Sequence, residues 1–392
     1  MTAQRNLRRL NIGFIPLLDC ATIVAAAEKG FAAGEDLDLR LARETSWANI
    51  RDRVVVGHFD AAHMLGPMVV ASTLGIGHFD IPLIAPMSLG LGGNTITVSG
   101  ALWSQMSSQG AQLGADPRTQ GMALARAIAA RNRAGHAPLT FAMVYPFSCH
   151  NYELRYWLAV SGVDPDKDLR LIVLPPPLLV DALRSGQIDG FCVGEPWGSL
   201  AVEQGIGCIA TFTSDIWRLG PEKVLGCREQ WARRHPDQLA SLIRALHAAA
   251  RWCELPANHE ELAQLLSQPR YVGVHASILL PALAGQLRCA QGAATVSRPD
   301  FLVFARQYAN LPWPEHAAWF YSQMVQWGQT TQSPDQLARA MATYRPDIYR
   351  EALLAADPAL QLPSARPAGV GQFFDNRSFD PAAIDRYLSS FA

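Results

Sequence analysis

The 392-residue chain has almost no net charge and lacks long apolar runs and CxxC cysteine pairs, and each of these features argues against a class of protein. Lys plus Arg number 33 and Asp plus Glu number 34, so no global basic face favours nucleic acid, although a local anion site is compatible with this balance. No uninterrupted apolar run of about 18 residues is present to span a membrane. The seven cysteines are scattered without a CxxC pair, so neither a zinc site nor a disulfide framework is indicated.

What the chain does contain is apolar material, with 49% hydrophobic residues against 17% charged ones. This composition supplies large cores and excludes a wholly disordered chain. At about 150 residues per domain, the length predicts two or three domains.

The N-terminal region bears on location in the cell. Basic residues precede an apolar stretch, but Pro16 and Asp19 interrupt that stretch, which does not fit a secretory leader. The sequence instead predicts a buried strand over Leu10–Leu17 and a helix that Asp19 caps and that runs to Lys29. We therefore expect a cytoplasmic protein, and the unpaired thiols agree with a reducing compartment.

Short apolar stretches alternate with amphipathic stretches over the first 200 residues, which predicts an α/β fold with parallel sheets. The predicted strands are Leu10–Leu17, Asp38–Leu41, Ala61–Met64, Leu83–Ala85, Ile96–Val98, Leu139–Met143, Arg170–Val173 and Gly190–Val193. Beyond about residue 221, helical spacing of apolar residues dominates. The predicted helices there are Glu229–His235, Pro236–Glu254, His259–Ser267 and Pro314–Gly328.

An internal repeat points to two similar α/β units. Gly57–Ala61 and Gly186–Gly190 both follow a helix, place Asp after a hydrophobic residue, and lead into a buried strand. Chance is the alternative, because this turn is common between helices and strands. Two such units predict two lobes with a ligand cleft: residues 1–98 in lobe I, 99–213 in lobe II, and 214–392 as a return to lobe I plus a helical C-terminal extension.

Two helix starts carry candidate ligand-binding side chains. Ser46 and Ser148 are suitable N-caps, and the free N–H groups of such helix starts accept small anions. Trp47 falls in the first turn of one helix and His150 in the first turn of the other. Each has a structural alternative: Trp47 packs its lobe, or His150 is an ordinary structural histidine.

Two further segments are expected at the edge of the cleft. Gly194, Glu195 and Pro196 directly follow a predicted strand, and Glu195 is expected to bond a neighbouring Lys or His. Lys223 lies where the chain returns to the first lobe, where its charge would neutralise an anion. The alternative for Lys223 is an ordinary solvated lysine.

The motifs together resemble those of the nitrate/bicarbonate-binding protein family (NrtA and CmpA), and in particular its leaderless branch of NasS-type nitrate/nitrite sensors. The resemblance runs from about residue 10 to residue 355. The matching segments are IGFIPLLDCATIVAAAEKGF, ETSWANIRDRV, FDAAHMLGPM, GGNTITVS, HNYELRYWLA, IDGFCVGEPW, PEKVLGC, LPWPEHAAWFYSQMVQWGQ and YRPDIYREA.

The resemblance implies a type II periplasmic-binding-protein fold, two α/β lobes that close on a small planar oxyanion. Carried over residue by residue, it implies four side chains at the anion and three residues along the wall: Trp47, Asn94, His150 and Lys223, then Gly194, Glu195 and Pro196. Asn94 enters only through the resemblance. Lysine would balance the charge of nitrate, whereas bicarbonate carries a proton that Glu195 could accept.

Three functions are open at this point. The resemblance favours a cytoplasmic sensor that binds nitrate or nitrite and thereby releases an RNA-binding antiterminator of the NasT type, without touching nucleic acid or membrane itself. The first alternative is the substrate-binding component of an ABC transporter for nitrate or bicarbonate. The second is an enzyme on the same fold that uses Cys20 and His63, although Cys20 is as readily a small buried residue. We expect no metal and no cofactor.

Overall fold

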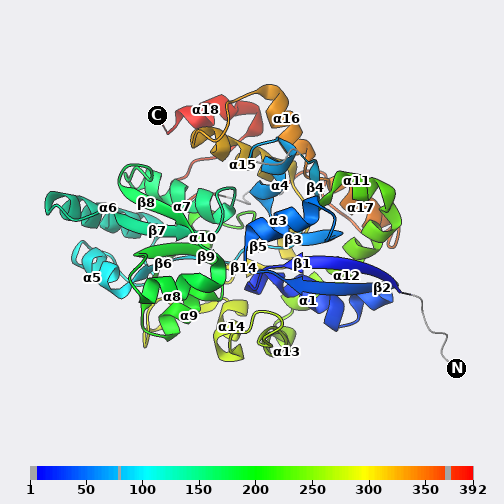
Figure 1. Ribbon diagram of the computed structural model, residues 1–392, viewed down its shortest axis with the longest axis horizontal. Helices are drawn as coiled ribbons and strands as arrows, with labels where there is room; N and C mark the ends of the chain where they lie inside the picture. The colour runs from blue at the N-terminus through cyan, green and yellow to red at the C-terminus, as the bar shows by residue number, and fades with distance from the viewer. Residues whose placement is uncertain (1–6, 78–80, 367–371, 392) are drawn as a thin grey trace.

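The computed structural model describes residues 7–77, 81–366 and 372–391. Within these ranges, two five-stranded sheets form two α/β lobes, and a mostly helical C-terminal segment packs against both (Figure 1). No helix in the described part of the chain is long and apolar enough to cross a membrane. The two-lobed α/β architecture expected from the sequence is confirmed.

The first sheet has the strand order β2-β1-β3-β11-β4. Its strands are β1 (Arg8–Phe14), β2 (Leu37–Arg43), β3 (Ala61–Leu65), β4 (Leu83–Ser88) and β11 (Lys223–Arg228). β1 is parallel to β2 and β3, whereas β11 is antiparallel to β3 and β4. The helices of this lobe are α1 (Ala21–Glu28), α2 (Phe31–Gly34), α3 (Trp47–Val55) and α4 (Gly66–Thr73), with the short 3₁₀ turn η1 (Leu18–Cys20) before α1.

The second sheet repeats this topology with the order β8-β7-β9-β6-β10. Its strands are β6 (Asn94–Ser99), β7 (Leu139–Met143), β8 (Leu169–Val173), β9 (Gly190–Gly194) and β10 (Gly207–Phe212). Its helices are α5 (Gly100–Ser108), α6 (Pro117–Arg133), α7 (Cys149–Val160), α8 (Leu179–Arg184), α9 (Trp197–Glu203) and α10 (Thr213–Ile216), with the 3₁₀ turn η2 (Pro176–Leu178) before α8.

The prediction of parallel sheets is wrong at one strand in each lobe, and that strand forms two antiparallel pairs. β11 in the first sheet and β6 in the second arrive directly from the other lobe, without a crossover helix in their own lobe, and both run antiparallel to their neighbours. Because β6 pairs in the second sheet, the chain first crosses between the lobes before Asn94, a few residues earlier than the boundary expected at residue 98.

The internal repeat is confirmed in three dimensions. The backbone N–H of Asn11 in β1 donates to Asp60 Oδ2 at 2.8 Å, and Asp60 N donates back to Asn11 O at 2.9 Å. In the second lobe, Thr140 N donates to Asp189 Oδ2 at 2.8 Å, and Asp189 N donates back to Thr140 O at 2.7 Å. The same aspartate clamp therefore fixes the start of β3 and the start of β9.

The two connections between the lobes run side by side and form a hinge. Gly92 N donates to Gly220 O at 3.0 Å, and Leu89 N donates to Lys223 O at 2.8 Å. The short strand β5 (Leu91–Gly92) in this hinge also pairs with β14 (Leu302–Val303) of the C-terminal segment. Gly92 has φ +69°, and a Cβ there would lie 2.4 Å from the carbonyl oxygen of Phe301, so this crossing requires glycine.

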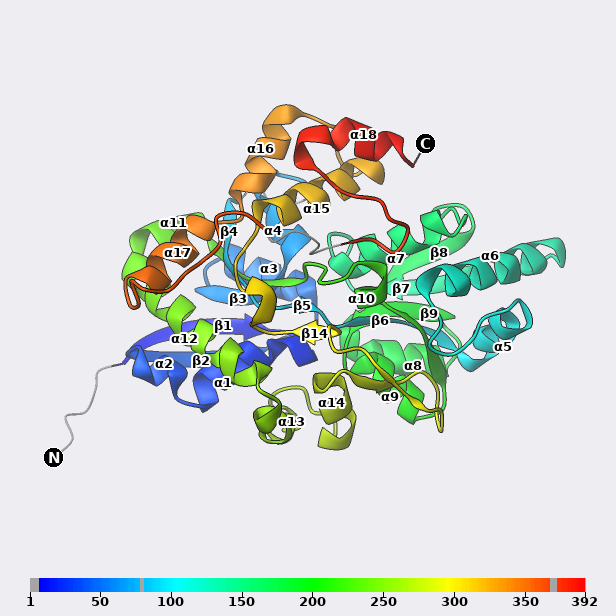
Figure 2. The same ribbon diagram turned by 180° about the vertical axis from the view of Figure 1, so that it is seen from behind.

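The C-terminal segment contacts both lobes, as Figure 2 shows from behind. It consists of α11 (Glu229–Arg234), α12 (Pro236–Glu254), α13 (His259–Leu266), α14 (Ala276–Leu283), β12 (Gln286–Arg288), β13 (Thr295–Ser297), β14, α15 (Pro314–Gln326), α16 (Pro334–Ala342), α17 (Pro346–Leu354) and α18 (Ile384–Ser389), with 3₁₀ turns at Pro256–Asn258, Arg306–Tyr308 and Pro381–Ala383. α12 packs on α1 of the first lobe, and α14 packs on α9 of the second. α15 touches α4 and α7, one from each lobe.

Candidate functional site

Side chains from both sheets meet in one buried cluster at the boundary between the lobes. Trp47 follows β2 and His150 follows β7, each at the carboxyl end of a strand. Asn94 and Lys223 begin the antiparallel strands β6 and β11, so they lie at the same edges, opposite Gly194 and Leu65. Trp47, Asn94, His150 and Lys223 are each at most 1% exposed. The structure thus places these four predicted side chains in one buried region.

The charge of this cluster centres on Lys223. Its Nζ lies 2.8 Å from Asp19 Oδ2, contacts the carboxylate of the preceding Glu222, and stands 5.8 Å from the centre of the Trp47 ring. Burial alone would lower the pKa of Lys223, but Asp19 and Glu222 hold that pKa above its usual value. Burial would likewise raise the pKa of Asp19, but Lys223 and His63 hold it below its usual range. Lys223 and Asp19 are therefore both charged.

His63 on β3 orients Asp19. Its Nε2 lies 3.0 Å from Asp19 Oδ1, and its Nδ1 accepts the backbone N–H of Ile15 at 3.5 Å, so the ring proton is on Nε2. Burial lowers the pKa of His63, with Asp19 opposing, and the imidazole is neutral. The expectation that Asp19 caps the first helix is wrong, because its carboxylate turns to Lys223 and His63 and makes no cap hydrogen bond.

The second lobe contributes Asn94 and Glu153. Asn94 Nδ2 donates to Glu153 Oε2 at 3.1 Å and to Glu222 Oε1 at 2.7 Å, so one amide group bridges two carboxyl groups. Burial raises the pKa of Glu153 to about 8, and the nearby Glu222 adds to that rise. Burial also raises the pKa of Glu222, against the opposing charge of Lys223. His150 Nε2 lies 3.9 Å from Glu222 Oε1.

Several buried polar atoms of the cluster lack a hydrogen-bond partner among the described residues: Trp47 Nε1, Asn94 Oδ1, and Nδ1 and Nε2 of His150. Burial lowers the pKa of His150 well below its usual value, and Lys223 lowers it further, so this ring is neutral and carries one N–H. A buried donor without an acceptor is costly. Trp47 and His150 therefore present N–H groups, from opposite lobes, in the same buried region as an ammonium group.

Both helix starts have the predicted capping. Ser46 Oγ accepts Asn49 N at 3.2 Å, and Ser148 Oγ accepts Asn151 N at 3.0 Å. These caps fix the first turns of α3 and α7, and thereby the positions of Trp47 and His150.

Glu195 does not have the role expected of it. Its carboxylate accepts the backbone N–H of Ser199 at 3.1 Å and the hydroxyl of Thr95 at 3.3 Å, and so caps α9 instead of bonding a Lys or His. Burial raises the pKa of Glu195 to about 7. Its carbonyl oxygen accepts Leu18 N at 2.7 Å, a backbone hydrogen bond between the lobes.

Gly194 and Pro196 are buried on either side of Glu195. A Cβ at Gly194 would lie 3.3 Å from Asn94 Oδ1 and 3.5 Å from Asp19 Oδ2, so Gly194 backs the cluster directly. The peptide bond before Pro196 is cis, and Pro196 is the N-cap residue of α9.

The lobes are closed over the cluster. At the rim, Arg51 Nη1 of α3 donates to the hydroxyl of Tyr145, which follows β7 in the other lobe, at 2.5 Å. Deeper inside, the thiol of Cys149 in the second lobe lies 3.6 Å from Glu222 O. Because the four side chains are at most 1% exposed, a ligand would enter this site only if the lobes separated.

Cys20 and His63 do not form a nucleophilic pair. The described contacts commit both ring nitrogens of His63 to Asp19 and Ile15. Burial raises the pKa of the Cys20 thiol well above its usual value, and the negative charge of Asp19 adds to that rise. A thiol held protonated in this way is a poor nucleophile.

Sequence reasoning missed Glu153 and Glu222 and gave Asp19 and His63 other roles. Glu153 lies three residues after His150 on α7, a spacing that puts both on one helix face and that could have revealed it. Glu222 directly precedes Lys223, but nothing in its neighbourhood indicates that it is buried.

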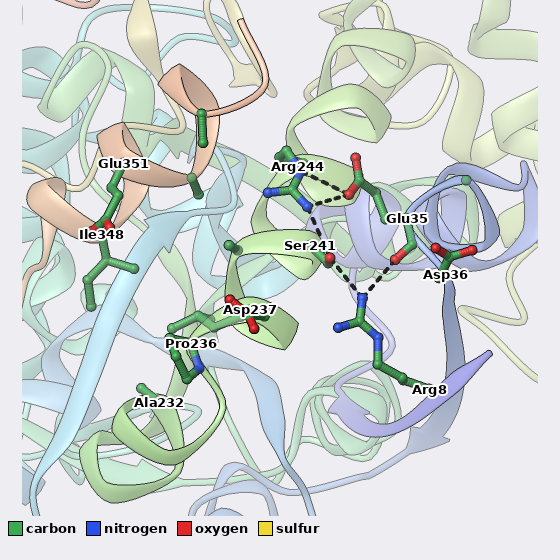
Figure 3. A pocket seen from close by; sticks show the side chains of 15 residues that line it. Arg8, Glu35, Asp36, Ala232, Pro236, Asp237, Ser241, Arg244, Ile348 and Glu351 are labelled. Carbon is green, nitrogen blue, oxygen red and sulfur yellow. Dashed lines mark hydrogen bonds and ion pairs between the residues drawn. The ribbon is translucent and has the colours of Figure 1, made fainter. Parts of the chain in front are cut away.

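A pocket of about 560 Å³ lies elsewhere, at the amino end of β1 beside α2, α12 and α17 (Figure 3). Its polar groups bond one another: Arg244 donates to Glu35 Oε2 at 2.6 and 2.8 Å, and Ser241 Oγ accepts from Arg244 and from Arg8 at 3.0 Å. Because ligands of open α/β sheets bind at the carboxyl ends of strands, the buried cluster between the lobes is the stronger candidate.

Two lobes with repeated topology, joined by a hinge and closed over buried polar groups, define a two-lobed binding protein of the periplasmic-binding-protein fold. Residues 3–267 match the model of the NMT1-like family. The chain belongs to this family and lies close to the NrtA and CmpA proteins within it.

The similarity to individual relatives spans nearly the whole chain. The chain is 33% identical to the nitrate/nitrite binding protein NrtA of Synechococcus elongatus, over 97% of this chain and 86% of that protein. It is 30% identical to the bicarbonate-binding protein CmpA of the same organism, over 98% of this chain and 86% of that protein. It is 35% identical to the nitrate import ATP-binding protein NrtC of a Synechocystis strain, over 88% of this chain but 49% of that protein.

The crystal structure of the periplasmic nitrate-binding protein NrtA from Synechocystis PCC 6803 superposes with a TM-score of 0.89 at 30% identity, covering 98% of this chain and 99% of that one. The family resemblance seen in the sequence and the type II periplasmic-binding-protein fold are confirmed. The finer assignment to the leaderless sensor branch stays a prediction.

Proposed function

We propose that this protein binds a small planar oxyanion, nitrate or nitrite, between its two lobes. The observation that carries the proposal is the fully buried Lys223, enclosed together with unpartnered N–H groups of Trp47 and His150 from opposite lobes. An ammonium group balances one negative charge, and neutral N–H donors complete the coordination of an anion without adding further charge. The printed name of the relative NrtA supports nitrate and nitrite as ligands.

Bicarbonate is the alternative ligand, and the printed name of CmpA supports it. Bicarbonate carries a hydroxyl group that needs an acceptor. The sequence pointed to Glu195 for that purpose, but Glu195 is bonded to Ser199 and Thr95, so Glu222 beside Lys223 is the better-placed acceptor.

The role that the relatives support best is that of the anion-binding component of an ATP-driven importer. NrtC carries the words "nitrate import ATP-binding" in its name and contains a segment similar to most of this chain. The partner would then be the ATP-binding component of such an importer. We propose no catalytic role, because Cys20 and His63 are not arranged as a nucleophile and its base.

The sensor branch that the motifs resemble gives a second role for the same site. In that role the protein is cytoplasmic, and nitrate shifts it between open and closed forms that differ in their affinity for an RNA-binding antiterminator of the NasT type. Two measurements separate the roles: the cell fraction that contains the protein, and the partner it retains in a pull-down with and without nitrate. Retention of the antiterminator only without nitrate supports the sensor, and retention of an ATP-binding component supports the importer.

Isothermal titration calorimetry with nitrate, nitrite and bicarbonate tests the binding itself. We expect heat with nitrate or nitrite and loss of that heat in Lys223→Ala. Lys167→Ala is the matched control, because the Lys167 side chain is 83% exposed. Absence of heat with all three anions would overturn the proposal.

A further inference from the structure

The buried cluster around Lys223 contains more carboxyl groups than positive charges. Three carboxyl groups, of Asp19, Glu153 and Glu222, face one ammonium group, and each of these residues is at most 5% exposed. We call these three the carboxylate cluster. His63 and His150 add no positive charge, because burial lowers the pKa of both. If all three carboxyl groups were ionised, the cluster would be net negative before any ligand entered.

An anion entering such a cluster would be repelled unless some of this charge is removed. Like charges at close range in a buried site repel strongly, and such pairs shed charge by binding protons. In the described part of the chain, no group of three or more His, Cys, Asp or Glu side chains is arranged to hold a metal ion. Protons are therefore the means of neutralisation that the residues themselves offer.

The geometry identifies which carboxyl groups take protons. Asp19 is paired with Lys223 at 2.8 Å and with His63 at 3.0 Å, and these contacts keep it ionised. Glu153 and Glu222 instead share one donor, Asn94 Nδ2, at 3.1 and 2.7 Å. Two carboxylates on one amide group repel each other, so this pair readily holds a proton.

The other groups that face the pair add only one cation. Both carboxyl groups face Lys223, Cys149 and Cys192. Glu222 also faces Asp19, His150 and Tyr344, and Glu153 also faces Thr213. Of these only Lys223 is positively charged, and it already contacts Glu222. An anion that binds Lys223 must therefore displace or weaken the main interaction that keeps Glu222 ionised.

We propose that nitrate binding is coupled to the uptake of one proton by the Glu153–Glu222 pair, which makes Glu222 a determinant of anion choice. Nitrate replaces Glu222 at Lys223 Nζ, and Glu222 takes a proton from the solvent. The protonated carboxyl group then donates a hydrogen bond to its neighbours or to the anion. This inference rests on the proposed function, since it concerns how the same site accommodates its ligand.

Bicarbonate differs from nitrate because it brings a proton of its own. Its hydroxyl group donates to an ionised Glu222, so bicarbonate binds without proton uptake. Nitrate affinity falls as pH rises, about tenfold per pH unit between the pKa of the pair in the free protein and its higher pKa in the complex. Bicarbonate affinity has no such dependence from this pair, so rising pH shifts the preference toward bicarbonate.

Calorimetry in several buffers tests the coupling on the wild-type protein. At one pH, about 7, nitrate is titrated in buffers that differ in ionisation enthalpy, with a chelator present. The slope of observed enthalpy against buffer ionisation enthalpy gives the protons taken up per anion. We expect a slope near one for nitrate and near zero for bicarbonate. Nitrate binding with a slope of zero, or binding that appears only when a divalent cation is added, would overturn this inference.

The variant Glu222→Gln provides a second readout. We expect its nitrate affinity to lose this pH dependence and its proton uptake to disappear. Glu203→Gln is the matched control, because it removes an exposed carboxyl group at the end of α9. We expect it to keep both the pH dependence of nitrate affinity and the proton uptake. If Glu222→Gln does not fold, the buffer series on the wild-type protein decides the question by itself. Absence of nitrate heat at every pH would instead contradict the proposed function, so the two failures are distinguishable.

Discussion

Lys223 and Asp19 form a buried ion pair within the first lobe, with 2.8 Å between Nζ and Oδ2. Lys223 begins β11 and Asp19 follows β1, so no residue of the second lobe is needed to form the pair. The first lobe thus presents an oriented ammonium group before the cleft closes. The second lobe adds His150 and the Asn94–Glu153 contact on closure, which separates charge recognition from hydrogen-bond recognition.

Replacing Lys223 with alanine should weaken nitrate binding by about 2–4 kcal/mol, because a desolvated anion loses its countercharge. This corresponds to a loss of roughly thirtyfold to a thousandfold in affinity. Titration calorimetry measures the loss, with Lys167→Ala as the control. A loss below tenfold would show that the anion lies elsewhere.

Asp19→Asn should destabilise the folded protein by about 3–5 kcal/mol at neutral pH, because it leaves Lys223 buried with one counterion fewer. The folded-state pKa of Asp19 lies below its unfolded value, near 3.9. The stability that Asp19 contributes is therefore complete above about pH 4 and is lost as pH falls toward the folded-state pKa. Urea denaturation of the wild type and of Asp19→Asn should show a difference in the free energy of unfolding. This difference should be constant above about pH 4 and should become smaller below it.

Glu153→Gln should stabilise the folded protein, whereas Asp19→Asn should destabilise it. The pKa of Glu153 is raised to about 8 in the folded protein, so the fold favours the protonated form. Wild-type stability therefore falls as pH rises from the unfolded value near 4.3 toward 8, and the glutamine variant avoids this loss. We expect the variant to be more stable by an amount on the order of a few kcal/mol at about pH 8. Equal pH dependence of the two proteins in urea denaturation would contradict this.

Tyr145→Phe should favour the open form, because it removes the hydroxyl that accepts a hydrogen bond from Arg51 across the rim. One hydrogen bond to a charged group contributes about 1.5–3 kcal/mol, and part of this is recovered from water once the rim opens. We expect faster nitrate dissociation and an affinity at least threefold weaker. Stopped-flow tryptophan fluorescence measures both the dissociation rate and the affinity. Tyr308→Phe, at an exposed tyrosine, is the control.

Cys20→Ser should leave anion binding unchanged, since the Cys20 thiol is buried and protonated and His63 is engaged by Asp19. Calorimetry on the variant checks this expectation. A large loss of nitrate affinity, with the fold intact by circular dichroism, would restore the case for a functional Cys20–His63 pair.

Sequence periodicity was most informative where local signals are strong. The long helix α12 was predicted residue for residue, because Pro236 marks its first turn and Pro256 follows its end. β11 was missed because Gly226 interrupts its apolar pattern. The structure explains that glycine: a Cβ there would lie 2.4 Å from the sulfur of Met64.

Three of the predicted site residues owe their place in the buried cluster to their position along the chain. Trp47 and His150 occupy first turns of capped helices, and Lys223 lies where the chain returns to the first lobe, so these three positions can be singled out from the sequence. Glu153 and Glu222 could not be predicted in the same way. Glutamates in helices and loops are usually solvated, and their burial here arises only because residues from both lobes enclose them.

The hinge has one further consequence. The backbone carbonyl of Lys223 accepts Leu89 N, so the residue whose ammonium group would bind the anion is also part of the crossing between the lobes. The proposed ligand thus lies beside the hinge and not near the outer end of either lobe. A small adjustment of β11 at the pivot becomes a displacement that grows with distance along each lobe. The surfaces that would report ligand binding most strongly are therefore the outer ends of the lobes, farthest from the proposed anion site.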